Sequence, residues 1–112
     1  MIKLIVAIKR KQGMSVEAFQ KHWHDGHASI VRASPATMKY IRRYIQCHTM
    51  AQQYEHGEPA FDGTAELWFD SVSNMDAFYK DPDYLATMKP DEPRFADMEQ
   101  TKFFVTLEHP IL

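Results

Sequence analysis

Alternation of apolar and polar residues predicts four β-strands along the chain. Residues 2–9 (IKLIVAIK) carry apolar side chains on both faces in the middle of the segment, which favours a strand covered from both sides. Residues 39–49 (KYIRRYIQCHT), 64–70 (TAELWFD) and 102–109 (KFFVTLEH) also alternate and are predicted to be the second, third and fourth strands.

The two-residue period assigns the side chains of the second and third strands to faces. In the second strand, one face is expected to hold Ile41, Ile45 and Cys47, and the other Tyr40, Tyr44, Gln46 and His48. In the third strand, the apolar face is expected to hold Ala65, Leu67 and Phe69, opposite Glu66 and Trp68. The polar and aromatic members of these faces are candidates for a site built on the sheet.

A 3.6-residue period predicts a helix from Val16 to Arg32. Ser15 is placed as its N-cap, because a serine oxygen can accept a hydrogen bond from an unpaired backbone N–H of the first turn. Phe19 and Trp23 begin an apolar stripe that faces the sheet. Pro35 is expected to close this region.

A second helical region is predicted between the third and fourth strands. It begins at a helix capped by Ser73. A further helix restarts at Pro82, because Asp81 can act as its cap and proline suits the first helical position. The segment DEPRFADM (91–98) is expected to form one more short turn, with Phe95 packed inward.

The resulting order, β-α-β-β-α-β, is that of the ferredoxin-like fold, an α+β architecture with an antiparallel four-stranded sheet. The 112 residues fit a single domain over residues 1–112. Helices can cover only one face of such a sheet. The apolar residues on both faces of the first strand therefore predict a homodimer joined sheet to sheet, in which a second copy shields the other face from water.

Composition narrows the choice of partners and compartment. The 13 Lys and Arg residues are balanced by 15 Asp and Glu, a net charge of -2, so no strong field attracts nucleic acid or an acidic membrane. The longest apolar run, LIVAI (4–8), is far shorter than the about 20 residues of a membrane span. Cys47 is the single cysteine; it is expected to be a buried, unreactive thiol, and the lack of a disulfide favours the cytoplasm.

Three of the six histidines fall within residues 19–31 (FQKHWHDGHASIV). His24 and His27 are about one helical turn apart, but His22 points about 200° away from His24, so the three rings cannot converge from one α-helix. No metal site is therefore predicted, and His22 and His24 are expected to be solvated. The chain also has no glycine-rich phosphate loop and no nucleophile elbow, and no cofactor is expected.

His27 is the candidate catalytic acid or base. It follows Trp23 by one turn on the side that faces the sheet, and an imidazole changes charge near neutral pH. Tyr44 and His48, from the second strand, are candidates to assist it. The candidates for binding a ligand are Trp23, Glu66, Trp68 and Phe95. Structural roles stay open beside these: a core histidine bonded to a backbone carbonyl, a core aromatic ring, or a carboxylate paired with an arginine.

Five segments, in this order, resemble the EthD family: VEAFQKHWHDGHASIV, YIRRYIQCH, GTAELWFDS, DEPRF and FFVTLEH. The resemblance covers essentially the whole chain. It implies a member of the dimeric α/β barrel superfamily, in which two four-stranded sheets close a barrel and a small cavity between helices and sheet holds a ring-shaped ligand. Of the three clustered histidines, only His27 matches the family pattern. Asp91 and Glu92 match its D-E-x-R-F segment, where helix capping and a functional role both stay open.

The relatives implied by this resemblance suggest the chemistry. The expected function is a small cofactor-independent enzyme that transfers protons on a cyclic hydrophobic molecule, as an isomerase, dehydratase, decarboxylase or cyclase. One alternative is an EthD-type oxidoreductase, monooxygenase or accessory protein in the degradation of xenobiotic or aromatic compounds. Others are a non-catalytic small-molecule binding protein and a haem enzyme.

Overall fold

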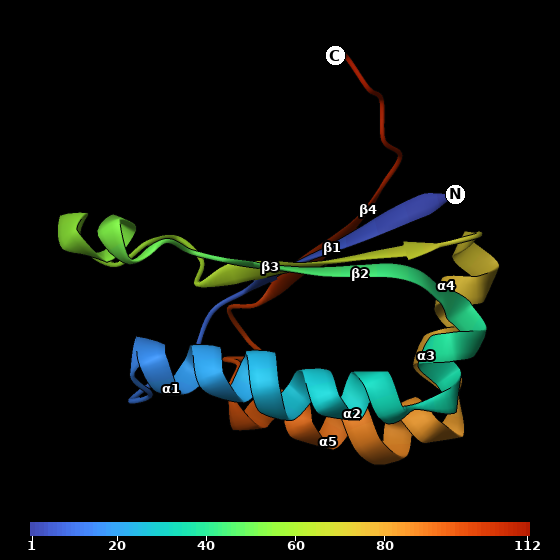
Figure 1. Ribbon diagram of the computed structural model, residues 1–112, viewed down its shortest axis with the longest axis horizontal. Helices are drawn as coiled ribbons and strands as arrows, with labels where there is room; N and C mark the ends of the chain where they lie inside the picture. The colour runs from blue at the N-terminus through green and yellow to red at the C-terminus, as the bar shows by residue number, and fades with distance from the viewer.

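Four antiparallel strands form one sheet in the computed structural model, which describes residues 1–112 (Figure 1). The strands are β1 (Ile2–Ile8), β2 (Ile41–His48), β3 (Gly63–Phe69) and β4 (Lys102–Thr106), in the spatial order β2-β3-β1-β4. This order confirms the predicted ferredoxin-like α+β fold. Strands β1 and β3 occupy the middle of the sheet. Both can therefore contribute side chains to a site on the face of the sheet that the helices cover.

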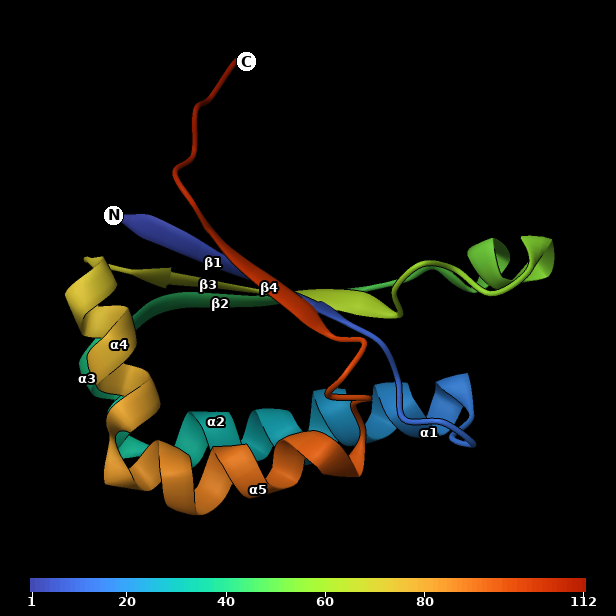
Figure 2. The ribbon, with the colours of Figure 1, turned by 180° about the vertical axis from the view of Figure 1, so that it is seen from behind.

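Two long helical stretches lie against one face of the sheet (Figures 1 and 2). The first comprises α1 (Val16–Lys21), the π-helix η1 (His22–His27) and α2 (Ala28–Ala33). The second comprises α4 (Val72–Lys80), the π-helix η3 (Tyr84–Met88), α5 (Lys89–Asp91) and the 3-10 turn η4 (Glu92–Arg94). None of these helices is long and apolar enough to cross a membrane.

The opposite face of the sheet carries no helix, and the C-terminal residues extend away on that side (Figures 1 and 2). We call it the helix-free face. Strand register and alternation assign to it Lys3, Ile5, Glu66, Trp68 and Phe104. The segment between β2 and β3 contains the 3-10 helix η2 (Ala51–His56) and projects beyond the end of the sheet.

Serine side chains cap the first helix of each stretch. The Oγ of Ser15 accepts a hydrogen bond from the backbone N–H of Ala18 at 3.1 Å, as predicted. The cap of α4 is Ser71, whose Oγ accepts from the N–H of Asn74 at 3.1 Å. The prediction of Ser73 was wrong, because β3 ends early enough for the helix to begin at the first of two neighbouring serines.

The connection into β2 also differs from its prediction. Ser34 is extended, and Pro35 then opens a further short helix, α3 (Pro35–Tyr40), rather than closing the helical region. Proline suits this first helical position, because the N–H that it lacks would be unpaired there. The strand consequently begins at Ile41 rather than Lys39.

A bulge near the start of β2 changes which side chains face the helices. The register shifts between Ile41 and Arg43, so that Ile41 lies opposite Phe69 while Tyr44 lies opposite Leu67. Both therefore point to the covered face. The prediction that Ile41 and Tyr44 take different faces was wrong, because the extra residue of a bulge interrupts the two-residue period.

Gly63 allows the ring of Trp23 to lie directly against the sheet. A methyl group at Gly63 would lie 2.5 Å from the carbonyl oxygen of Cys47 and 2.6 Å from Cζ3 of Trp23, closer than van der Waals contact. We expect Gly63→Ala to lower the free energy of unfolding by about 1–3 kcal/mol, because overpacking forces neighbouring groups apart. Urea denaturation of the two proteins measures this difference.

Gly26→Ala is the matched control for Gly63→Ala. Its methyl group would meet only ring atoms of His22, at 3.7 Å, which is an ordinary contact. Alanine is also favoured over glycine within a helix by about 1 kcal/mol, so no loss of stability is expected. Equal losses in the two variants would contradict the close approach at Gly63.

Candidate functional site

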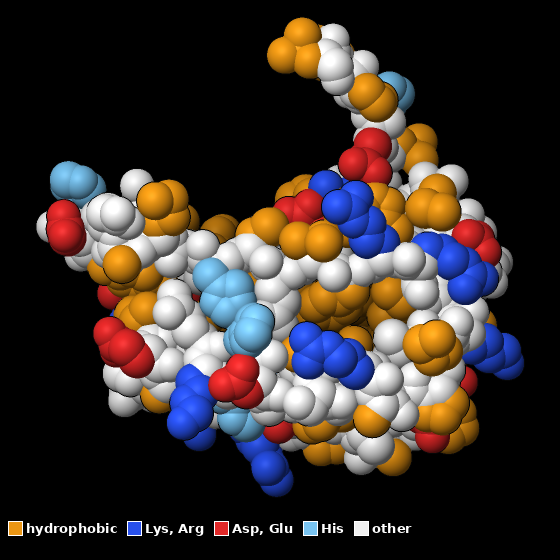
Figure 3. Space-filling model, in the orientation of Figure 1, with side chains coloured by type: hydrophobic (Ala, Val, Ile, Leu, Met, Phe, Trp, Pro, Cys, Tyr) orange, Lys and Arg blue, Asp and Glu red, His pale blue; other side chains and the backbone are white.

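A cavity of about 460 Å³ lies between the sheet and the helical layer. Figure 3 shows it as a hollow with hydrophobic side chains in its interior. Its volume falls within the range of about 300–1,000 Å³ that is usual for small-molecule sites. Of the 22 residues that line it, 18 are hydrophobic and none is lysine or arginine. The cavity therefore suits a largely apolar ligand.

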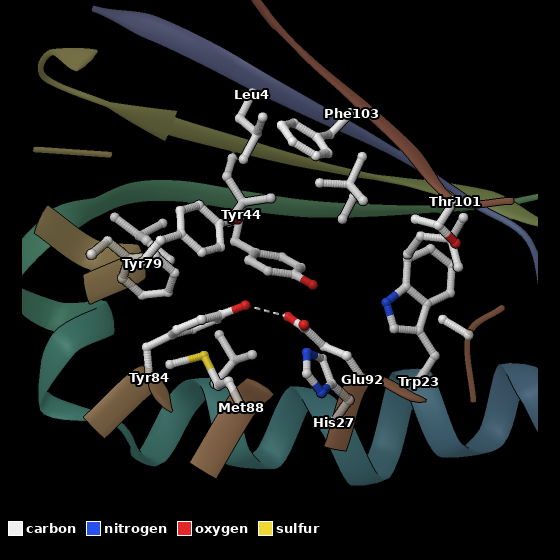
Figure 4. Close-up of a pocket in the computed structure, with 18 of the residues that line it drawn as sticks. Leu4, Trp23, His27, Tyr44, Tyr79, Tyr84, Met88, Glu92, Thr101 and Phe103 are labelled. Atoms are coloured by element: carbon white, nitrogen blue, oxygen red, sulfur yellow. Dashed lines mark hydrogen bonds between the residues drawn. The ribbon is translucent and has the colours of Figure 1, made fainter. Parts of the chain in front are cut away.

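Asp91 connects His27, which lines this cavity, to His22, which does not. Its Oδ2 lies 2.9 Å from Nδ1 of His27, and its Oδ1 lies 3.0 Å from Nε2 of His22. An ionised carboxylate only accepts hydrogen bonds, so each ring nitrogen donates. In neutral His27 the proton is thus on Nδ1, and the basic Nε2 faces the cavity (Figure 4). Asp91 forms no helix-capping bond, so capping does not account for its position.

The π-helix η1 explains why two histidines five positions apart share one carboxylate. In an α-helix, such residues point about 140° apart. The wider turn of a π-helix, with i→i+5 hydrogen bonds, brings His27 above His22 on the same side. The prediction of a solvated His22 was therefore wrong. His24 is 66% exposed and its Nδ1 lies 2.9 Å from Oδ1 of Asp25, as expected for a surface residue.

The clustered histidines do not belong to a metal-binding group of side chains. No set of three or more His, Cys, Asp or Glu side chains has an arrangement that could hold a metal ion. The rings of His22 and His27 are instead directed at the single carboxylate of Asp91. That no metal is required stays a prediction, which activity in the presence of a chelator tests.

The surroundings of His27 favour its neutral form. The residue is 6% exposed, and this burial lowers its pKa; the hydrogen bond to Asp91 opposes the shift only in part. A neutral imidazole with an available Nε2 is the state that a general base needs. The structural alternative, a histidine bonded to a backbone carbonyl, does not apply, because the partner of Nδ1 is a carboxylate.

Glu92 and two tyrosines add polar groups to the same cavity. The hydroxyl of Tyr84 donates to Oε2 of Glu92 at 2.7 Å. Burial raises the pKa of Glu92, and burial also raises the pKa of Tyr44. Figure 4 shows the hydroxyl of Tyr44 and the carboxyl of Glu92 facing the space beside His27. Environments that raise the pKa of one group and lower that of its neighbour are typical of acid–base pairs.

Four of the predicted site residues line the cavity, namely His27, Tyr44, Trp23 and Phe95. His48 does not line it. Its ring stacks on the ring of Trp23, with 4.5 Å between centroids, and its Nε2 donates to Oε1 of Gln46 at 2.9 Å. The structure thus separates His48 from His27 by the indole, and places it where it supports Trp23.

Glu66 and Trp68 lie away from the cavity, on the helix-free face. Leu67 points to the cavity, so its two neighbours in β3 point to the opposite side. Glu66 pairs with Nζ of Lys3 at 2.5 Å, and Nε1 of Trp68 donates to Oε1 of Glu108 at 2.5 Å. They were predicted to bind a ligand together with His27 but point away from it, because alternation along β3 does not show which of its two faces the helices cover.

Two tyrosines that complete the cavity were not among the predicted site residues, although the helical period of the sequence places Tyr79 on an inward face. Tyr79 and Tyr84 lie in the second helical stretch and pack edge to face, with ring centroids 4.8 Å apart. Burial raises the pKa of each hydroxyl, and the nearby carboxylate of Glu92 raises it further. In the sequence, the resemblance at D-E-x-R-F indicated Glu92 as a candidate, but no motif indicated Tyr79 or Tyr84.

The EthD domain family matches residues 11–99 of the chain. No curated protein matches the chain. Among solved structures, an EthD family protein from Bacillus halodurans is 20% identical, with a TM-score of 0.72 over 97% of this chain and 99% of that chain. A dimeric protein of unknown function and ferredoxin-like fold from Bacteroides fragilis is 17% identical, with a TM-score of 0.67 over 93% and 92%.

A Dabb family protein with a ferredoxin-like fold from Mesorhizobium loti is 14% identical, with a TM-score of 0.61 over 98% of this chain and 96% of that chain. At these identities the solved structures establish a common fold and nothing about chemistry. The family match is independent of them and covers most of the sequence, including His27, Asp91 and Glu92. The chain therefore belongs to the EthD family.

Proposed function

We propose that this protein is a cofactor-independent enzyme that transfers protons on a cyclic, hydrophobic small molecule. The observation that carries the proposal is the arrangement of His27: a buried imidazole, held at Nδ1 by Asp91, with Nε2 directed into an apolar cavity. A carboxylate that fixes the tautomer of a histidine is a recurrent means of orienting a catalytic base.

The proposed reaction needs no oxidant or reductant. Nε2 of His27 takes a proton from the bound ring, and the electron pair of the broken bond moves into the π system of the ring. Asp91 stabilises the imidazolium that forms, without itself taking the proton. Nε2 then returns the proton at a different atom of the ring, which completes an isomerisation and restores neutral His27.

A non-catalytic binding protein is the second candidate, and it is favoured by the predominantly apolar lining of the cavity. One experiment separates the two. Native mass spectrometry of protein purified from cell extract identifies a retained ligand, which is then incubated with the protein in D₂O and followed by NMR. Deuterium uptake at ring positions supports the enzyme, whereas a bound ligand that takes up none supports the binding protein.

The pH dependence of proton transfer follows from the lowered pKa of His27. The neutral base is expected to persist below pH 6.5, so kcat/KM should fall only at more acidic pH. The free energy of unfolding is expected to change in the same direction. As the pH falls, His27 takes up a proton in the unfolded chain before it does so in the folded chain. The stabilisation that neutral His27 contributes is therefore complete above about pH 6.5 and is lost at lower pH. An acidic limb above pH 6.5 in the rate profile would contradict a buried base.

We also propose that two copies of the chain associate through their helix-free faces. Phe104, which pairs with Ile5 across the sheet, is 53% exposed there. Cys47 was predicted to be buried but is exposed on this face, where its Sγ donates to Oε2 of Glu66 at 3.3 Å. Apolar side chains gathered on an uncovered sheet favour a partner. The relative from Bacteroides fragilis, with the same fold, is described as dimeric.

Light scattering at micromolar concentration tests the dimer. We expect a mass twice the 13.1 kDa of the chain. Phe104→Lys should shift the protein towards the monomer, because it places a charge among the apolar side chains of the proposed interface. Lys11→Ala is the control, since Lys11 is exposed and lies outside the sheet. A monomeric wild-type protein would exclude the association.

A further inference from the structure

We propose that the ligand carries an uncharged carbonyl oxygen, such as that of a cyclic ketone or lactone, and that the indole N–H of Trp23 donates to it. The inference rests on the proposed function for the location of the ligand in the cavity.

The indole of Trp23 presents a buried donor without an acceptor. The side chain is 0% exposed, and its Nε1 has no hydrogen-bond partner in the protein. Figure 4 shows this nitrogen directed into the cavity, towards the hydroxyl of Tyr44. Burial raises the pKa of that hydroxyl and the neighbouring indole N–H opposes the shift, but the two groups form no hydrogen bond with each other. Leaving a buried donor unsatisfied is unfavourable, and nearly all such groups in proteins are paired. The position therefore calls for an acceptor supplied by a bound molecule.

The ring of Trp23 is held in place from two sides, so the donor has a defined direction. Gly63 lies against Cζ3 of the indole, at a distance that leaves no room for a side chain. The imidazole of His48 stacks on the indole face. Trp68, the second tryptophan, differs in this respect, because its Nε1 already donates to Glu108. Only Trp23 offers a free indole donor to a ligand.

The charges around the cavity select an uncharged acceptor. An indole N–H donates and cannot accept, so the group it faces must be an acceptor. The lining contains the acids Asp76 and Glu92 but no lysine or arginine. A ligand carboxylate or phosphate would be buried there beside an acid and without a positive partner, which is costly. A carbonyl oxygen avoids this cost, and its two lone pairs can accept from both Trp23 and Tyr44.

This position of the oxygen fits the proposed proton transfer. When Nε2 of His27 removes a proton from the carbon next to the carbonyl, the C–H electron pair forms a C=C bond. The C=O π pair then moves to the oxygen, giving an enolate. The N–H of Trp23 faces the oxygen on which that charge develops, and donors so placed stabilise the transition state. Return of the proton from His27 to carbon restores a neutral ligand and a neutral base.

Two bicyclic probes of similar shape test the inference, 1-tetralone and tetralin, which differ by the ketone oxygen. The chain has two tryptophans, so a ¹⁵N spectrum contains two indole N–H signals, and the loss of one in Trp23→Phe assigns them. We expect 1-tetralone to shift the Trp23 signal downfield and leave that of Trp68 in place. Tetralin should produce no downfield shift at Trp23.

Binding affinities give the second measurement. Trp23→Phe keeps an aromatic ring but removes the donor, and should weaken binding of 1-tetralone by about 2- to 10-fold while leaving tetralin unchanged. Equal affinity of the wild-type protein for both probes, tighter binding of the carboxylate 1-naphthoate, or failure of 1-tetralone to bind at millimolar concentration would each overturn the inference.

The same measurement in His27→Gln separates this inference from the proposed function. That variant lacks the base but keeps Trp23, so its preference for 1-tetralone over tetralin should persist. If the preference persists while neither protein exchanges ligand protons, carbonyl recognition holds and catalysis fails. If the wild-type protein exchanges ligand protons without any preference for the ketone, the proposed function holds and the role of Trp23 fails.

Discussion

Replacing His27 by glutamine is expected to lower the rate of proton transfer on the retained ligand by about 10²–10⁴-fold, the usual contribution of a general acid–base group. Glutamine is of similar size and its amide N–H can still donate to Asp91, so the site keeps its shape while it loses the basic nitrogen. Deuterium uptake into the ligand, followed by NMR, measures the rate in the two proteins.

Two further histidine variants serve as controls. His24→Gln changes an exposed side chain and should alter stability by less than about 0.5 kcal/mol and leave the rate unchanged. His22→Gln removes a ring that positions Asp91 and should lower the rate by less than His27→Gln does. If His27→Gln lowers only the melting temperature and the rate is kept, His27 is a core residue and the proposed mechanism is wrong.

Replacing Asp62 by alanine should produce the largest loss of stability, about 3 kcal/mol. The residue is 0% exposed and its carboxylate accepts three hydrogen bonds. Oδ2 accepts from the backbone N–H of Arg10 at 2.7 Å, and Oδ1 accepts from Nη1 of Arg10 at 2.7 Å and from the hydroxyl of Tyr54 at 2.6 Å. Alanine would leave all three donors without this acceptor. Urea denaturation at pH 7 measures the loss.

Glu58→Ala is the matched control, because Glu58 pairs with the same guanidinium of Arg10 from a half-exposed position. Such a pair contributes less than about 1 kcal/mol. Burial of Asp62 opposes its ionisation, but hydrogen bonds from Arg10 and Tyr54 prevail and hold its pKa below the usual value. Its stabilisation is therefore complete above about pH 4 and lost as the pH falls further. Equal losses in the two variants at pH 7 would contradict the central role of Asp62.

Local patterns accounted for the elements of the fold. The two-residue period located all four strands, and the oxygen of Ser15 caps the helix that it was predicted to cap. The helix restart at Pro82 is also observed, with Oδ1 of Asp81 accepting from the N–H of Asp83 at 2.9 Å. These features depend on interactions between residues a few positions apart, which the order of the amino acids specifies directly.

The faces of the strands were only partly predictable. The bulge at the start of β2 moved Ile41 to the side of Tyr44. Glu66 and Trp68 lie on the face of β3 opposite to Leu67 and therefore point away from His27. Alternation assigns neighbours within one strand to opposite faces, but it does not say which face of one strand meets which face of the next. Register, a property of two strands together, decides that.

The sequence by itself determined the ferredoxin-like fold, the family and His27 as the histidine beside the sheet, because these follow from short-range periodicity and from motifs in order. Only the tertiary structure decided that Asp91 binds both His27 and His22, that Glu92 and Tyr84 share the cavity, and that the N–H of Trp23 lacks a partner. Asp91 is 64 positions from His27 along the chain. Contacts at that separation depend on how the helices pack on the sheet and on the local π-helix, which no local pattern encodes.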